Sequence, residues 1–70
     1  MEFLVVLFPR KRRVQIDGEF TGSTNELIEL EGGKHSVSLG PPANFTPASR
    51  TVNVRNTSAL MPMTVVFGEA

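Results

Sequence analysis

The residues of this 70-residue chain with the clearest chemical potential surround its single histidine, His35. A histidine close to a serine suggests nucleophilic catalysis, in which the imidazole takes the proton of the hydroxyl group. Ser36 and Ser38 do not suit this role, because residues one and three positions from His35 point to the opposite face of a strand. We expect instead that His35 packs where a strand begins and that one of its ring nitrogens hydrogen-bonds a backbone group.

Other patterns for catalysis or cofactor binding are incomplete. The chain has no cysteine, so it offers no thiolate ligand, and no spacing around His35 indicates a metal site. The run Gly32-Gly33-Lys34 has part of the pattern of a phosphate-binding loop, but Ile28 and His35 stand where that loop needs a glycine and a hydroxyl group. The acids between Asp17 and Glu31 have the character of solvated surface residues. We therefore predict no catalytic residue, no metal site, no cofactor and no enzymatic activity.

A basic segment is the strongest candidate for recognition of another molecule. Four of the seven cations are consecutive: Arg10, Lys11, Arg12 and Arg13. Adjacent like charges repel and favour water, so the segment is expected in a loop or at the entry to a strand. Two interpretations stay open: a solvated loop that pairs with Glu29 or Glu31, or a contact for nucleic acid or another anionic polymer. The zero formal net charge and the lack of Trp and Tyr weigh against the second.

Length and composition predict one small domain, residues 1–70, with an ordinary hydrophobic fraction of 40%. The longest apolar run, Phe3 to Phe8, is much shorter than the about 20 residues that span a bilayer. The basic segment follows this run instead of preceding it, unlike the arrangement in a secretory signal. We expect a cytoplasmic location if the chain is full length, and an envelope-associated one if it is a domain of a longer protein.

The N-terminal run from Phe3 to Phe8 predicts a strand that ends at Pro9. Its apolar residues do not alternate with polar ones, which predicts that both faces of the strand are covered. A neighbouring loop is one candidate for the cover, and another subunit or domain is the other. For a subunit contact, Phe3, Val5 and Leu7 are the candidate residues.

The stretch from Val14 to Gly40 has the clearest strand pattern of the chain. Apolar and polar residues alternate in its first and last parts, and Asp17-Gly18 is typical of a tight hairpin turn. We expect Gly32-Gly33 to repeat this turn and therefore predict an antiparallel meander in which Phe20 points inward. The segment Leu27–Leu30 is compatible with a helical turn or a strand, and its length favours the strand.

The remaining third of the chain predicts one irregular stretch and two strands. The loop from Gly40 to Pro47 has Phe45 as its expected anchor on the core. Strands are expected at 51–55 and 60–67, and Pro62 places the first half of the latter at an edge or a bulge. Six or seven short strands with this spacing predict a small all-β, antiparallel β-sandwich of the immunoglobulin-like or prealbumin-like kind.

Three parts of the sequence together form a family pattern: Val14-Gln-Ile-Asp-Gly-Glu-Phe-Thr-Gly22, Gly33-Lys-His-Ser-Val37 and the proline loop with its aromatic residue. On these residues the chain resembles the PEGA domain family over roughly Leu4 to Phe67. It departs from the family pattern at Ser23-Thr24-Asn25, where Thr-Pro is usual, and at Asn44-Phe45, where Gly-Tyr is usual. The resemblance implies a small antiparallel sandwich that serves as an accessory module in larger envelope or surface proteins, without known catalysis.

These observations predict a non-enzymatic structural or interaction module. A sheet edge or the apolar N-terminal strand would recognise a protein partner, and self-association into a homo-oligomer is the simplest form of that contact. Contact with a cell envelope or a carbohydrate is an alternative that the resemblance alone implies. Neither membrane insertion nor a small-molecule substrate is expected.

Overall fold

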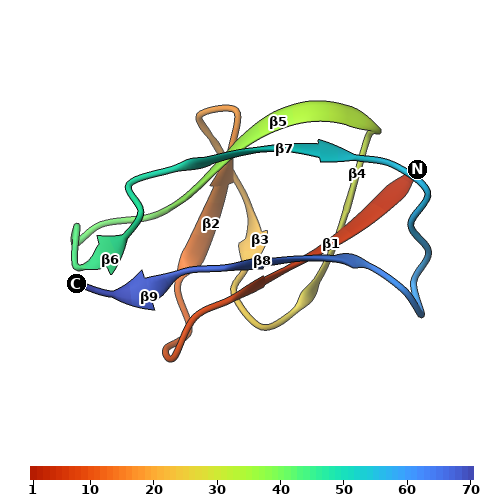
Figure 1. Cartoon of the computed structure of the whole chain (residues 1–70). Coiled ribbons are helices and arrows are strands. Elements are labelled where there is room, and N and C mark those ends of the chain that lie inside the picture. The colour runs from red at the N-terminus through yellow and green to blue at the C-terminus, as the bar shows by residue number, and fades with distance from the viewer.

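A computed structural model describes residues 1–70 and contains nine strands and no helix, so no helix is available to cross a membrane. The strands in chain order are β1 (Glu2–Leu7), β2 (Arg13–Ile16), β3 (Glu19–Ser23), β4 (Leu27–Leu30), β5 (Gly33–Leu39), β6 (Phe45–Thr46), β7 (Arg50–Val54), β8 (Met63–Val66) and β9 (Gly68–Glu69). Two sheets face each other as a small sandwich, and the ribbon of β6 and β9 lies at one end (Figure 1). The predicted all-β fold is confirmed.

The sheets have four and three strands, in the orders β3-β2-β5-β7 and β4-β1-β8. The strand count exceeds the six or seven expected because β6 and β9 have two residues each and pair only with each other. One pairing is not antiparallel, since β8 runs parallel to β1 with Val6 opposite Val65. The alternation of apolar and polar residues along a strand does not reveal strands of only two residues. It also does not tell whether a strand that is distant in sequence will pair parallel or antiparallel.

The expected meander is correct at its first turn and wrong at its second. Asp17 and Gly18 have φ values of 54° and 86° and join β2 to β3 in a two-residue hairpin, as predicted. At Gly32-Gly33, however, the chain crosses from one sheet to the other, because β4 pairs with β1 whereas β5 pairs with β2. The strand assignment of Leu27–Leu30 is confirmed, but which sheet it joins depends on β1, more than 20 residues away in sequence.

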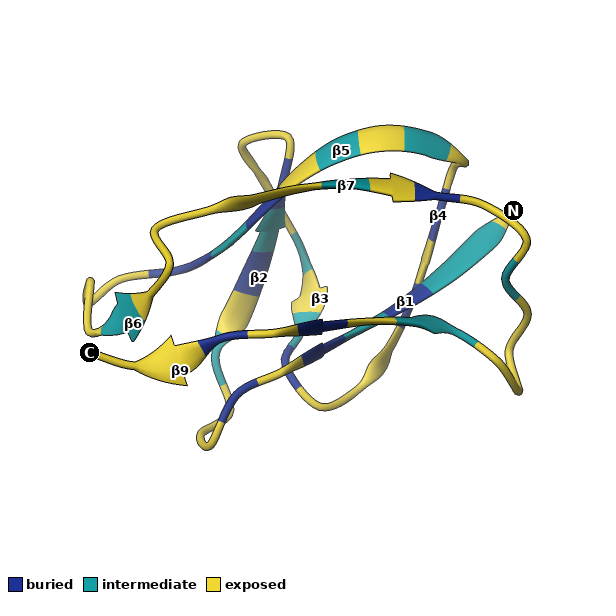
Figure 2. Cartoon of the chain, viewed as in Figure 1, coloured by how far each residue is buried: buried dark blue, intermediate teal, exposed yellow.

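Twelve buried apolar residues form a single core between the sheets (Figure 2). On β1 the burial alternates: Leu4 and Val6 are fully buried, whereas Leu7 is 39% exposed. The expectation that a loop of the same chain covers the outer face is therefore wrong at Leu7, whereas cover by another subunit or domain stays a prediction. β1 is central in its sheet, so apolar residues can occupy its outer positions without being enclosed on that side.

Two further expectations concern the second half of the chain. Phe45 anchors the proline loop as predicted, because it packs edge-on against the buried Phe67 with the ring centroids 5.8 Å apart. The last strand is shorter than predicted, since β8 begins only at Met63. The preceding residues form a turn in which the backbone groups of Ser58 and Met61 bond each other reciprocally, at 3.2 and 3.1 Å.

The two leucines of β1 test the assignment of its faces. We expect Leu4→Ala to lower the free energy of unfolding by about 3 kcal/mol, because it opens a cavity in the core. Leu7→Ala is the matched control and should cost less than about 1 kcal/mol, since Leu7 is partly exposed on the outer face. Urea denaturation measures both values. Similar losses for the two variants would contradict the assignment.

Candidate functional site

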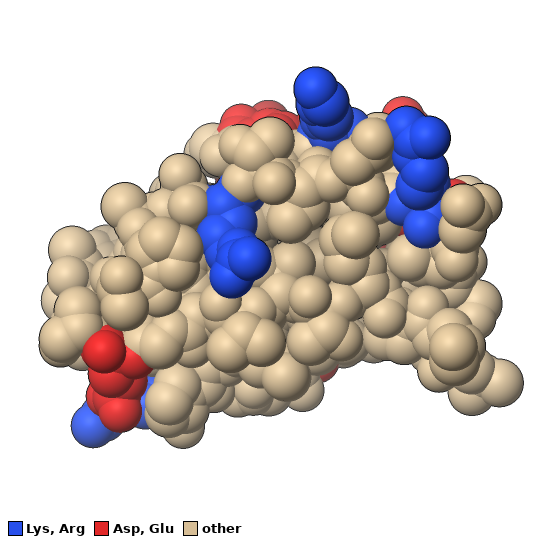
Figure 3. Space-filling model, viewed as in Figure 1, with Lys and Arg blue, Asp and Glu red and all other residues tan.

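The four cations of the basic segment lie in the connection between β1 and β2 and at the start of β2. Arg10 pairs with Glu69 at 3.1 Å and Lys11 pairs with Glu26 at 3.4 Å. The expected partners Glu29 and Glu31 were therefore wrong, because the fold brings the C-terminal ribbon and the β3–β4 connection to this segment instead. Figure 3 shows positive and negative residues in separate small groups over the visible face, and not as one basic field.

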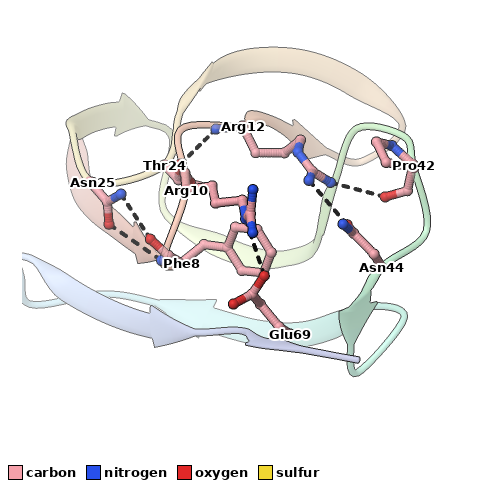
Figure 4. A network of polar contacts seen from close by, with 8 residues as sticks. All are labelled: Phe8, Arg10, Arg12, Thr24, Asn25, Pro42, Asn44 and Glu69. Atoms are coloured by element: carbon pink, nitrogen blue, oxygen red, sulfur yellow. Dashed lines mark hydrogen bonds and ion pairs between the residues drawn. The ribbon is translucent and has the colours of Figure 1, made fainter.

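Arg12 has a structural position that its residue type alone does not indicate. Its guanidinium group donates to the carbonyl oxygens of Gly40 and Pro42, at 3.2 and 2.9 Å, and to Oδ1 of Asn44 at 3.0 Å (Figure 4). It also lies 5.3 Å from the ring centroid of Phe8. The guanidinium thus ties the proline loop to the end of the sandwich.

Arg13 covers an aromatic ring that was expected inside the core. Its guanidinium carbon lies 3.9 Å from the centroid of Phe20, whose side chain is 45% exposed. Phe20 is opposite Gln15 in the β2–β3 pair, and Gln15 lies between the buried Val14 and Ile16. Phe20 therefore belongs to the outer face of its sheet, and the prediction that it points inward was wrong.

Thr24 and Asn25 hold the basic segment in place, a role that the sequence analysis did not detect. The buried hydroxyl of Thr24 accepts from the backbone N–H of Arg12 and donates to the carbonyl oxygen of Arg10, both at 2.8 Å. The Asn25 amide brackets Phe8, accepting from its N–H and donating to its carbonyl oxygen (Figure 4). The sequence did contain a signal for this role, namely a hydroxyl residue and an amide residue shortly after Gly22. Such residues commonly hydrogen-bond nearby backbone groups.

All four cations of the basic segment therefore contact other parts of the same chain. Two of them pair with acids, one holds backbone carbonyl groups and one covers a ring. Binding of nucleic acid or another anionic polymer through these residues stays a prediction. Such binding would have to compete with the contacts that each cation already makes.

The outer face of the β4-β1-β8 sheet carries the candidate subunit-contact residues. Phe3 and Val5 are partly buried on this face and Leu7 is 39% exposed. The neighbouring strands add Leu27, opposite Val5 and 49% exposed, and Val66, opposite Leu7 and 55% exposed. The structure thus joins the three predicted residues to two that the sequence analysis did not select, in one apolar surface across three strands.

His35 connects the ends of the two sheets. Its Nε2 lies 2.7 Å from the carbonyl oxygen of Glu31, directly after β4, which confirms the expected bond to a backbone group. Its Nδ1 lies 2.6 Å from Oδ2 of Asp17 in the β2–β3 turn, a contact that was not expected. Both partners are acceptors, so only the protonated ring, with two N–H donors, satisfies both contacts.

This arrangement shifts the pKa of both members of the pair. The hydrogen bond to Asp17, supported by the carbonyl group of Glu31, raises the pKa of His35 above its ordinary value. The hydrogen bond from His35, with a second one from the backbone N–H of Ser36, lowers the pKa of Asp17. The two side chains therefore form a charged clasp at this end of the sandwich.

The rest of the surface offers no enclosed site. It has no pocket, and no group of three or more His, Asp or Glu residues gathers in a way that could hold a metal ion. The apolar outer face and the edges of the sheets are therefore candidates for recognition beside the basic segment.

The contacts of Arg12 predict that a lysine at this position would stabilise the fold less than the arginine does. We expect Arg12→Lys to lower the free energy of unfolding by roughly 1–2 kcal/mol, because one ammonium group cannot reach all three oxygen acceptors. The same substitution at the exposed Arg10 is the control and should change it by less than about 0.5 kcal/mol. Urea denaturation at constant salt measures both. Equal effects would show that Arg12 does not hold the proline loop.

The His35–Asp17 clasp predicts a pH dependence of stability. A raised pKa of His35 stabilises the fold below the ordinary histidine value, and this contribution is lost as pH rises through the raised value. A lowered pKa of Asp17 stabilises the fold above the ordinary aspartate value, and this contribution is lost as pH falls. We therefore expect the contribution of the pair to be largest between about pH 4 and pH 6.5. Urea unfolding across pH measures it.

The matched control for this prediction is Asp17→Asn, because asparagine tolerates positive φ and can keep the bond from the N–H of Ser36. The variant should lose much of the stability change on the alkaline side. In nuclear magnetic resonance (NMR) titrations the pKa of His35 should be lower in this variant than in the wild type. A wild-type His35 that titrates at the ordinary value would contradict the clasp.

Comparison with known proteins identifies the family of the chain. A search of curated proteins and of solved structures found no match. The family model described as the PEGA domain matches residues 8–64, so the match begins after β1 and ends within β8. It includes the Asp17-Gly18 hairpin, Gly22 and His35, which carry the resemblance seen in the sequence. The chain belongs to the PEGA domain family.

Proposed function

We propose that this chain is a non-enzymatic interaction module that binds protein through its β4-β1-β8 sheet, in the simplest case a second copy of itself. The observation that carries this proposal is the apolar outer face of the sheet. Leu7, Leu27 and Val66 come from three neighbouring strands and remain substantially exposed there. Exposed apolar side chains that gather in one surface are typical of protein contact sites.

The charge distribution supports a contact between identical copies. Strand β8, Met63–Val66, has no charged residue, and Glu29 is the charged residue of β4 on this face, opposite Phe3. On β1, Glu2 is turned to the other side and is held by the N–H and Oγ1 of Thr57, at 2.9 and 2.6 Å. Two copies of the chain can therefore come together through this sheet with little like-charge repulsion.

Membership in the PEGA family supports a role as a module. The resemblance in the sequence implied a small accessory module in larger envelope or surface proteins. A flat sheet face fits this role, because it offers an area of contact and needs no enclosed site.

Concentration-dependent NMR tests the proposal on the unmodified chain. Between about 20 μM and about 1 mM, a range that includes weak dimers, we expect amide signals of β1, β4 and β8 to shift. Signals of β3 and β5 in the other sheet are the internal control and should stay constant, while sedimentation velocity should show a growing dimer fraction. A monomer throughout this range would overturn self-association, and shifts confined to the other sheet would overturn the choice of surface.

A further inference from the structure

The sandwich has four edge strands, and three of them have features that discourage pairing with another strand. β3 is interrupted by a bulge, because its register with β2 shifts between Arg13 and Gln15. β4 has glutamates before, within and after it, at positions 26, 29 and 31. β7 begins with Arg50 and is followed by Arg55. Bulges and charges of this kind are the usual protection of exposed edges.

The edge of β8 has neither a bulge nor a charge of its own. In Figure 1 it runs along the near side of the molecule, and the corresponding region of Figure 3 is mostly uncharged. Its residues are Met-Thr-Val-Val, and two of them have the β-branched side chains of good strand formers at exposed positions: Thr64 and Val66. Thr64 makes no hydrogen bond through its side chain, so no polar contact covers this part of the edge.

The backbone of this edge points into solvent at two positions. The N–H of Phe67 donates to the carbonyl oxygen of Leu7 at 2.9 Å, so the backbone groups of the odd-numbered residues face β1. Because these directions alternate along a strand, the N–H and C=O groups of Thr64 and Val66 face away from β1. Arg50 Nη1 reaches the carbonyl oxygen of Val66 from outside, at 3.3 Å, which agrees with this direction.

We propose that β8 pairs antiparallel with β8 of a second copy, about a two-fold axis beside Val65. Thr64 of each copy then lies opposite Val66 of the other, and their outward N–H and C=O groups complete four hydrogen bonds. The two three-stranded sheets become one six-stranded sheet with a continuous apolar outer face. This inference rests on the proposed function and specifies its contact.

Pairing between two copies suits the edge of β8 better than it suits the edges of β4 and β7. An antiparallel copy of an uncharged strand brings each outward donor opposite an acceptor, and the strand itself has no charged residue to repel its copy. Self-pairing of β4 would bring glutamates together, and self-pairing of β7 would bring arginines together. The contact of Arg50 with Val66 is exposed and must open, so Arg50 limits the pairing.

The test compares two substitutions at one exposed position. Thr64→Pro removes an outward N–H but none of the bonds to β1, and proline is tolerated on an edge strand. Thr64→Val keeps this N–H and the shape of the side chain. Sedimentation velocity should show dimerisation at least tenfold weaker for Thr64→Pro, which loses a bond in each half of the contact, and nearly unchanged for Thr64→Val. Arg50→Gln, which removes the charge at this edge, should strengthen it.

Leu7→Ser separates the edge contact from packing of one outer face on another. It should leave edge pairing nearly unchanged, whereas it would weaken face-to-face packing. If Leu7→Ser weakens the dimer and folded Thr64→Pro does not, the edge contact is overturned and the proposed sheet surface stands. A wild-type chain that stays monomeric overturns both.

Amide hydrogen exchange of the wild type provides a measurement that does not depend on the folding of Thr64→Pro. The N–H groups of Thr64 and Val66 should exchange slowly in concentrated solution and rapidly on dilution, while those of Val65 and Phe67, which face β1, stay protected at both concentrations. Equal exchange of Thr64 and Val66 at both concentrations in a dimeric sample would overturn the edge contact.

Discussion

The packing of two apolar sheet faces against each other is the constraint on which the rest of this structure depends. The chain has only 70 residues and no cysteine to form a disulfide, so the small core must supply most of its stability. Leu4 and Val6 of one sheet and Val14 and Val37 of the other are fully buried in it. β1 contributes Leu4 and Val6 to the core and is central in its sheet, and the apolar residues of its other face lie on the surface.

Polar residues hold the ends of this sandwich. Arg12 binds backbone carbonyl groups of the proline loop, and Thr24 binds backbone groups where β1 passes into β2. His35 joins a turn of one sheet to the end of a strand in the other. A sandwich is open at its ends, where backbone groups lack partners from a ladder, so side chains that satisfy them stabilise the closure. These contacts are structural, and residue type alone did not indicate most of them.

The surfaces that these contacts leave open include the outer face of the β4-β1-β8 sheet and the edge of β8. They adjoin each other at β8, whose side chains belong to the face and whose backbone belongs to the edge. An interaction module needs no more than this, because a contact between sheets draws on apolar area and on backbone hydrogen bonds that every strand offers.

The sequence by itself determined the all-β class, the hairpin at Asp17-Gly18, the anchoring of Phe45 and the family, because alternation and turn residues act over a few positions. It also selected the residues of β1 that lie on the outer face. Only the tertiary structure decided that β4 joins β1, that β8 runs parallel to it and that Phe20 points outward. It also decided the partners of the cations and of His35. These features depend on which distant segments meet, and a pattern within one segment has no information about the segment that will pack against it.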